Sequence, residues 1–192
     1  VADIDLENKE WKRIFPDSGY ITEAYAGTFD GAFHTITGLK VTASAANQGL
    51  FGGIGLATVD GKTVTATVKN LNVEGSVTAS NNNVGGIVGQ INAGSVLNCS
   101  FTGSVSSSKA RANIGGIVGY VNGDKPDKKP TVVISGCVNR ASVLTEKDAL
   151  NTVAGGIVGY AKYTEITDCY NAGTVPGTSR TGGIGGQLQN NV

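Results

Sequence analysis

A five-residue cassette, Gly-Gly-Ile-Val-Gly, occurs three times in this chain, and a related glycine cluster lies on either side of the three copies. The glycines that open the five Gly-x-x-Gly cores are Gly49, Gly86, Gly116, Gly156 and Gly183. The repeating unit is about 27 to 30 residues long, with insertions in two copies, which is a length typical of solenoid repeats. The chain is therefore interpreted first as a repeat protein.

A second block of matching chemistry follows each of the first four cassettes. Its copies are residues 71–77, 99–105, 137–143 and 169–175. The first and last positions are always apolar and the fifth is always Gly or Ala, although Asn139 and Asn171 interrupt the apolar pattern at the third position. Alternation of this kind indicates a β-strand with one buried face.

A single unit of this length is too short to bury its own apolar face, whereas stacked units bury a continuous core. Parallel stacking places equivalent positions about 4.8 Å apart. We therefore expect an all-β parallel β-helix, or β-solenoid, of about five to six coils. The cassette glycines are expected to allow positive φ angles or close approach of neighbouring coils.

Residues 1–41 lack the cassette and are rich in large aromatic side chains, namely Trp11, Phe15, Tyr20, Tyr25, Phe29 and Phe33. We expect this segment to form an N-terminal cap and first coil, with the aromatic rings closing the end of the core. Residues 42–192 are expected to form the repeat coils of the same continuous domain. Because the chain stops just after a cassette, we also expect it to be part of a longer protein that continues into another domain.

These residues resemble the GLUG-motif repeats of bacterial surface and secreted proteins, which also occur beside immunoglobulin-A-protease-type metallopeptidases. Gly49-Leu50-Phe51-Gly52 is similar to the motif, and the three Gly-Ile-Val-Gly cores are similar to its common variant. The opening Asp3-Ile4-Asp5-Leu6, Trp11 and the segments 27–31 and 34–36 resemble the sequence that often precedes such repeats. The resemblance implies an extracellular or cell-surface β-helical module and carries over no catalytic residue.

Composition limits the partners that this chain can attract. Lys plus Arg equals Asp plus Glu at 15 each, so no overall field draws in nucleic acid or an anionic membrane. No apolar run approaches the roughly 20 residues that a membrane-spanning helix needs. We therefore expect no nucleic-acid partner and no direct membrane insertion.

The three cysteines, Cys99, Cys137 and Cys169, occupy the first position of successive blocks. The pattern predicts an inward column of thiols, for which a reduced structural role is favoured over a disulfide or redox site. With one histidine and no Cys-x-x-Cys pair, we expect no metal site and no cofactor.

No constellation of residues indicates catalysis. His34 could act as a general base near Asp30, but a lone histidine without a nucleophile is more often structural. Glu165 and Asp168 have no acidic partner in the neighbouring repeats, so a polar solvent face is favoured over a glycosidase pair. Asn139 and Asn171 share one repeat position and are expected to form a hydrogen-bonded ladder, with sugar contact as the alternative. We therefore expect no enzyme activity.

Two insertions at one corner provide the candidate binding residues. The first insertion, 57–68, contains a two-residue hairpin signal with Asp60 and Lys62, and the second, 122–130, is polar and rich in proline. Its charged residues are Asp124, Lys125, Asp127, Lys128 and Lys129. Insertions in solenoids often lie on the binding face, although tolerated surface decoration explains them equally well.

The sequence is compatible with three functions. The first is an adhesin-like module that binds a glycan or a host extracellular protein. The second is a spacer that displays another domain of the same chain, and the third is a polysaccharide-active enzyme of the β-helix class.

Overall fold

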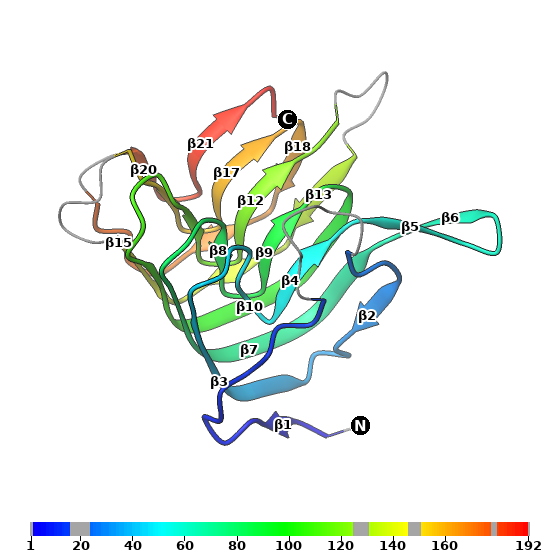
Figure 1. Cartoon of the computed structure of the whole chain (residues 1–192), viewed down its shortest axis with the longest axis horizontal. Coiled ribbons are helices and arrows are strands. Elements are labelled where there is room, and N and C mark those ends of the chain that lie inside the picture. Colours follow the sequence, from blue (N-terminus) through cyan, green and yellow to red (C-terminus); the bar gives the residue numbers. More distant parts are fainter. Residues whose placement is uncertain (1, 16–23, 125–130, 146–150, 178–179, 192) are drawn as a thin grey trace.

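The computed structural model describes residues 2–15, 24–124, 131–145, 151–177 and 180–191. Within these residues the regular elements are β-strands, and nearly all strand pairs are parallel (Figure 1). No helix of the described residues is long and apolar enough to cross a membrane. The expected all-β parallel β-solenoid is confirmed.

Three parallel sheets run along the stack. The long sheet contains the second block of each repeat, in strands β1 (Ile4–Asp5), β2 (Thr28–Asp30), β3 (Thr35–Ala43), β7 (Thr67–Ala79), β10 (Gly94–Ser107), β13 (Val132–Ser135), β14 (Val138–Asn139), β15 (Ser142–Thr145), β18 (Thr164–Thr167) and β19 (Tyr170–Asn171). The pre-cassette sheet contains β8 (Val84–Gly85), β11 (Asn113–Gly115), β16 (Val153–Gly155) and β20 (Arg180–Gly182). The post-cassette sheet contains β4 (Phe51–Ile54), β9 (Val88–Ile91), β12 (Val118–Asn122), β17 (Val158–Lys162) and β21 (Gly185–Gln189).

The repeat positions lie in register from coil to coil. Cys99 of β10 pairs with Leu71 of β7, and Phe101 pairs with Val73 on one side and Asn139 on the other. The first, third and seventh block positions of β7 and β10 are buried, as the alternation predicts. In-register stacking therefore builds the core from columns of equivalent side chains.

The fifth block position departs from the expected alternation. Gly103 is exposed, with φ of 129°, and a Cβ atom there would lie 1.9 Å from the carbonyl oxygen of Gly75 in the preceding coil. In β10 this position is a backbone contact between coils, whereas Ala141 at the same position of the third block is fully buried in the core. Only glycine combines this positive φ with so close a contact.

The cassettes form the tight corner between the pre-cassette and post-cassette sheets. Gly86 N donates to Gly116 O at 3.2 Å, so the corner itself continues the inter-coil hydrogen bonding. A Cβ at Gly116 would lie 2.2 Å from the carbonyl oxygen of Gly156. The expected close approach of coils at the cassettes is confirmed, while the intervening Ile117 and Ile157 point into the core and are fully buried.

The N-terminal segment covers one end of the stack, as expected, with part of its aromatic set. Trp11, Tyr25 and Phe29 pack against the core, and the Phe29 and Phe51 rings lie 5.3 Å apart. The expectation that Phe33 also closes the core is wrong, because its side chain is 66 % exposed. Tyr20 lies outside the described residues.

Candidate binding groove

The pre-cassette and post-cassette sheets lie close together at the cassette corner and diverge with distance from it. A Cβ at Gly115, the last residue of β11, would lie 1.9 Å from the carbonyl oxygen of Val118, the first residue of β12. Farther from the corner the two strands carry full side chains, and a groove of about 550 Å³ opens between the walls. The residues that line it are Arg111, Asn113, Tyr120, Asn151, Val153, Tyr160, Arg180 and Gln187.

The post-cassette wall of the groove is aromatic. Tyr120 of β12 pairs in register with Tyr160 of β17, and their rings stack with centroids 5.2 Å apart and planes 23° apart. The Tyr160 hydroxyl donates to Gln189 Oε1 at 2.5 Å. Partial burial raises the pKa of the Tyr120 phenol, and the neighbouring Tyr160 raises it further by a smaller amount. Both tyrosines are half-buried, and Tyr120 keeps its phenolic proton at neutral pH.

The pre-cassette wall begins as a ladder of amides. Asn113 Nδ2 donates to Asn83 Oδ1 at 2.9 Å, and Asn83 Nδ2 donates to Asn47 Oδ1 at 2.8 Å. A second hydrogen bond of Asn83, to Gln90 Oε1 at 3.1 Å, joins the two walls directly. The ladder therefore fixes the spacing of the walls on the N-terminal side of the tyrosine pair.

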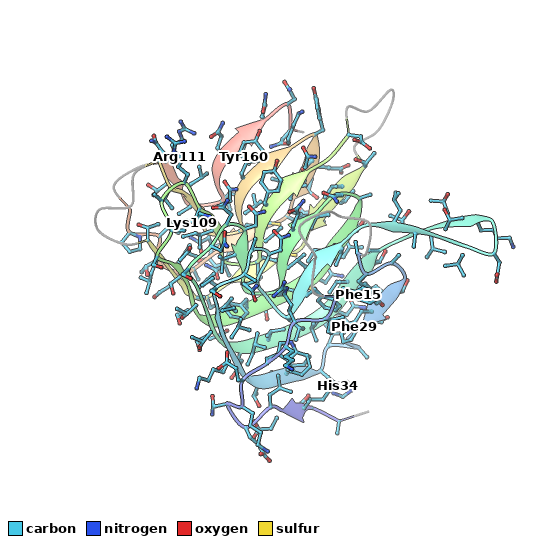
Figure 2. All side chains as sticks on the ribbon, viewed as in Figure 1. Phe15, Phe29, His34, Lys109, Arg111 and Tyr160 are labelled. Carbon is cyan, nitrogen blue, oxygen red and sulfur yellow. The ribbon has the colours of Figure 1, made fainter. Side chains whose placement is uncertain are left out.

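Two guanidinium groups complete the groove. Arg180, in register with Val153, donates from Nη1 to Gln187 Oε1 at 2.7 Å, while Arg111 lies in the turn before β11 with φ of 61°. No salt bridge among the described residues involves either arginine, and the described lining contains no carboxylate. Figure 2 shows Arg111 and Tyr160 toward the C-terminal part of the stack, far from His34 and Phe29 near the capped end.

The first predicted binding insertion forms the expected hairpin. Strands β5 (Leu56–Val59) and β6 (Lys62–Thr65) pair antiparallel around Asp60 and Gly61, whose φ angles of 49° and 72° suit a two-residue turn. The hairpin projects away from the stack, with Asp60 and Lys62 exposed at its tip (Figure 1).

The second predicted insertion leaves the stack at the same corner. Both insertions connect the post-cassette sheet to the long sheet, between β4 and β7 and between β12 and β13, so the expected common edge is confirmed. Asp124 is exposed, and its backbone N–H donates to Thr131 Oγ1 at 3.1 Å. Lys125, Asp127, Lys128 and Lys129 lie outside the described residues. Asp60, Lys62 and Asp124 are not part of the groove lining.

His34 and Asp30 do not pair with each other. His34 Nδ1 lies 3.2 Å from Asp3 Oδ1. The hydrogen bond from the backbone N–H of Thr35 lowers the pKa of the Asp3 carboxyl, and the hydrogen bond with His34 lowers it further by a smaller amount. Asp30 instead contacts Lys69 Nζ at 3.2 Å. His34 and Asp30 therefore do not form an acid and base pair.

The cysteine column lies where the repeat pattern places it. Cys99 and Cys137 are buried, Cys169 is half-buried, and all three are free thiols. Burial raises the pKa of the Cys99 thiol to about 12. Within the described residues, no group of three His, Cys, Asp or Glu side chains could hold a metal ion.

The groove was not among the sites inferred from the sequence, although the sequence carries a signal for it. The residue after the last glycine of successive cassettes is Gln90, Tyr120, Tyr160 and Gln187, and these four residues lie in register. A column that is polar or aromatic directly after a recurring glycine cluster is an outward wall. Its partner wall comes from residues before the cassette, outside both insertions.

Comparison with known proteins agrees with this architecture. The model of the GLUG motif matches residues 80–106 and 151–175, which contain the second and fourth blocks of the repeat. Halomucin of Haloquadratum walsbyi (strain DSM 16790 / HBSQ001) is 34% identical over 168 residues, which cover 80% of this chain but 2% of Halomucin.

A solved structure shares the fold. The "putative immunoglobulin A1 protease" of Bacteroides ovatus superposes with a TM-score of 0.55 at 21% identity, over 81% of this chain and 49% of that chain. The chain thus corresponds to a small part of Halomucin and to about half of the Bacteroides ovatus chain. The repeated cassette, the in-register coils and the two matched regions together show that this chain contains GLUG-motif repeats.

Proposed function

We propose that this chain is a non-catalytic, glycan-binding module of a secreted or cell-surface protein, and that the groove beside the cassettes is its binding site. The stacked pair Tyr120 and Tyr160 carries this proposal, because it lies in a groove with amide and guanidinium groups. Sites that recognise small molecules combine aromatic surface with a few convergent polar groups. Tyrosine suits a sugar because its apolar ring and its hydroxyl meet the mixed surface of a pyranose.

The periodicity of the groove also suits an extended sugar chain. Successive coils repeat the wall groups about every 4.8 Å, which is close to the length of one sugar residue in an extended chain. Tyr120, Tyr160 and Gln187 therefore offer one side chain per sugar along three coils. Gln90, in register before them, is buried and hydrogen-bonded to Asn83 and Asn92. A glycan bound this way runs parallel to the solenoid axis.

The absence of carboxylates from the described groove lining argues against the polysaccharide-active alternative, because glycosidases place two carboxyl groups beside the bond that breaks. Export to the cell surface follows the resemblance to GLUG-repeat proteins. Other domains of a longer chain would then be displayed or assisted by this module.

A second candidate is recognition of a host extracellular protein by the hairpin edge. Leu56 and Val59 on the β5–β6 hairpin are 57% and 53% exposed, which leaves apolar contacts free on a projecting element. The charged residues Asp60, Lys62 and Asp124 lie on the same edge. This candidate uses a different surface from the groove, so mutations can distinguish the two candidate functions.

Binding of the purified chain to a glycan array and to immobilised extracellular-matrix proteins tests both candidates. Tyr120→Ala and Tyr160→Ala should weaken glycan binding about tenfold or more, because each removes an aromatic contact worth about 1 kcal/mol or more and a hydroxyl. Tyr170→Ala is the matched control, since Tyr170 is 63% exposed on the long sheet and outside the groove.

A loop variant completes the test. Removing the β5–β6 hairpin (56–65) and shortening the insertion at 122–130 should leave glycan binding intact. Loss of binding in that variant, with the tyrosine variants unaffected, would move the site to the hairpin edge. A folded chain that binds nothing on either panel would favour the spacer function.

A further inference from the structure

We propose that the groove selects acidic glycans, and that Arg111 and Arg180 bind carboxylate groups carried on alternate sugars of the chain. This inference rests on the proposed glycan-binding function and adds the class of ligand. The ligand that it names is a polysaccharide with a uronic acid at every second residue.

The charge of the groove differs from that of the whole chain. The chain has 15 basic and 15 acidic side chains, yet the described groove lining has two arginines and no Asp or Glu. Elsewhere on the described surface, Lys9, Lys40 and Lys69 have carboxylate partners within 4 Å, whereas Lys62, Lys109 and Arg140 are in no salt bridge between described residues. The groove is therefore a local site where positive charge is left for a ligand.

Arg180 is held in a position that suits a carboxylate. Gln187 Oε1 accepts one N–H of its guanidinium at 2.7 Å, and this contact orients the planar group across the end of the tyrosine wall. A guanidinium has five N–H donors, so the others remain for a ligand. Arginine binds carboxylates through two parallel hydrogen bonds, which gives both affinity and orientation.

Arg111 occupies a backbone conformation that does not favour arginine. Its φ is 61°, and the equivalent residue of the next coil, set by the pairing of Asn113 with Val153, is Asn151 with φ of 56°. Asparagine adopts this left-handed region readily, whereas long side chains do so with strain. A strained residue at the mouth of a groove is typical of a functional position.

The two arginines lie two coils apart. Arg111 precedes β11, Asn113 pairs with Val153, and Val153 pairs with Arg180, so the separation along the solenoid axis is about 10 Å. One sugar residue has about the length of one coil. Carboxylates on alternate sugars would therefore meet Arg111 and Arg180, while the intervening sugar lies beside Tyr120 and Tyr160.

A hyaluronan octasaccharide tests this inference, because glucuronate alternates in it with an uncharged N-acetylated sugar. The matched probe is the same octasaccharide with its carboxyl groups reduced to primary alcohols. Titration calorimetry at about 0.15 M salt limits long-range attraction between exposed charges. We expect the acidic form to bind about tenfold or more tightly than the reduced form.

Arginine variants test whether Arg111 and Arg180 cause the difference in affinity between the acidic and the reduced octasaccharide. Arg111→Gln and Arg180→Gln should each lower affinity for hyaluronan severalfold and leave affinity for the reduced form unchanged. Arg140→Gln, which removes an exposed arginine outside the groove, is the control and should change neither. A poly-glutamate of similar charge should bind weakly, since it lacks the sugar surface that meets the tyrosines.

The outcomes separate this inference from the function on which it rests. Equal binding of both octasaccharides, lost in Tyr120→Ala, would overturn the selection for acids and keep the glycan site. Equal weakening by Arg140→Gln, or tight binding of poly-glutamate, would show nonspecific attraction and overturn the selection as well. Binding of neither octasaccharide, nor of any glycan on the array, would overturn both proposals.

Discussion

Asn139 Nδ2 donates to Asn171 Oδ1 at 2.8 Å, and thereby joins the same repeat position in two successive coils. Asn139 also closes a ring with its own backbone, because its Oδ1 accepts from Ala141 N at 3.0 Å and its Nδ2 donates to Ala141 O at 3.1 Å. Asn171 makes the same two bonds with Gly173. The ladder expected from the sequence is confirmed, and it supports the backbone bend as well as the stack.

Removing the inner amide should destabilise the protein more than removing the outer one. Asn139 is fully buried, so Asn139→Ala leaves the N–H and C=O of Ala141 unsatisfied and should cost about 1–3 kcal/mol of unfolding free energy. Asn171 is half-buried, so water replaces part of its bonding and Asn171→Ala should cost less. Urea unfolding of both variants measures the difference.

The double variant measures the inter-coil bond alone. We expect a coupling free energy of about 0.5 kcal/mol or more between the two sites. Additive effects of the two single changes would contradict a direct bond between the amides.

The sequence was sufficient for the fold because the repeat determines which residues lie over one another. Once the blocks at 99–105 and 137–143 are aligned, the partners of Cys99 and Phe101 follow without knowledge of the loops. The cassette corner was predictable for the same reason, since glycine at a fixed position implies close backbone contact.

The groove was harder to predict because two separate segments of each coil form its walls. Asn113 and Tyr120 flank one cassette, and their convergence depends on how sharply the chain turns at Gly116 and Ile117. The residues directly before the second block, Asn70, Asn98 and Asp168, form a left-handed corner of the backbone. The φ angles of 53°, 51° and 52° explain why Asn and Asp recur there.

Two glycines of the same cassette position should respond differently to an added methyl group. In Gly116→Ala the new Cβ would lie 2.2 Å from Gly156 O and 2.3 Å from Asn139 Cγ, so the coils must separate. We expect a loss of about 1–3 kcal/mol of unfolding free energy. Gly183→Ala is the control, because no atom lies within 4 Å of the position that its added methyl group would take, and it should change stability by less than about 0.5 kcal/mol.

Thermal and urea unfolding should therefore give clearly different free energies of unfolding for the two alanine variants. Equal stability of Gly116→Ala and the parent protein would contradict close coil contact at the cassette.

The projecting hairpin should contribute little to the stability of the stack. Val59 on β5 is 53% exposed, so Val59→Thr should change the free energy of unfolding by less than about 0.5 kcal/mol. The same substitution at Val68 on β7, which is fully buried, places a hydroxyl in the core and should cost about 1–3 kcal/mol. Circular dichroism melts of the two variants test this, and equal losses would mean that the hairpin packs on the stack in solution.

The cysteine column should react at its outer end first. The neighbouring Cys137 thiol lowers the pKa of the half-buried Cys169 to about 7, whereas burial raises the pKa of Cys99 to about 12. The thiolate is the reactive form, so labelling of the native protein by a disulfide reagent should increase as pH rises through about 7 and then level off. Mass spectrometry should place that label on Cys169, with Cys99 and Cys137 labelled only after unfolding, and Cys169→Ser should abolish native labelling. Prior labelling of Cys137, or a rate that keeps increasing with pH well above neutrality, would contradict the order of burial along the column.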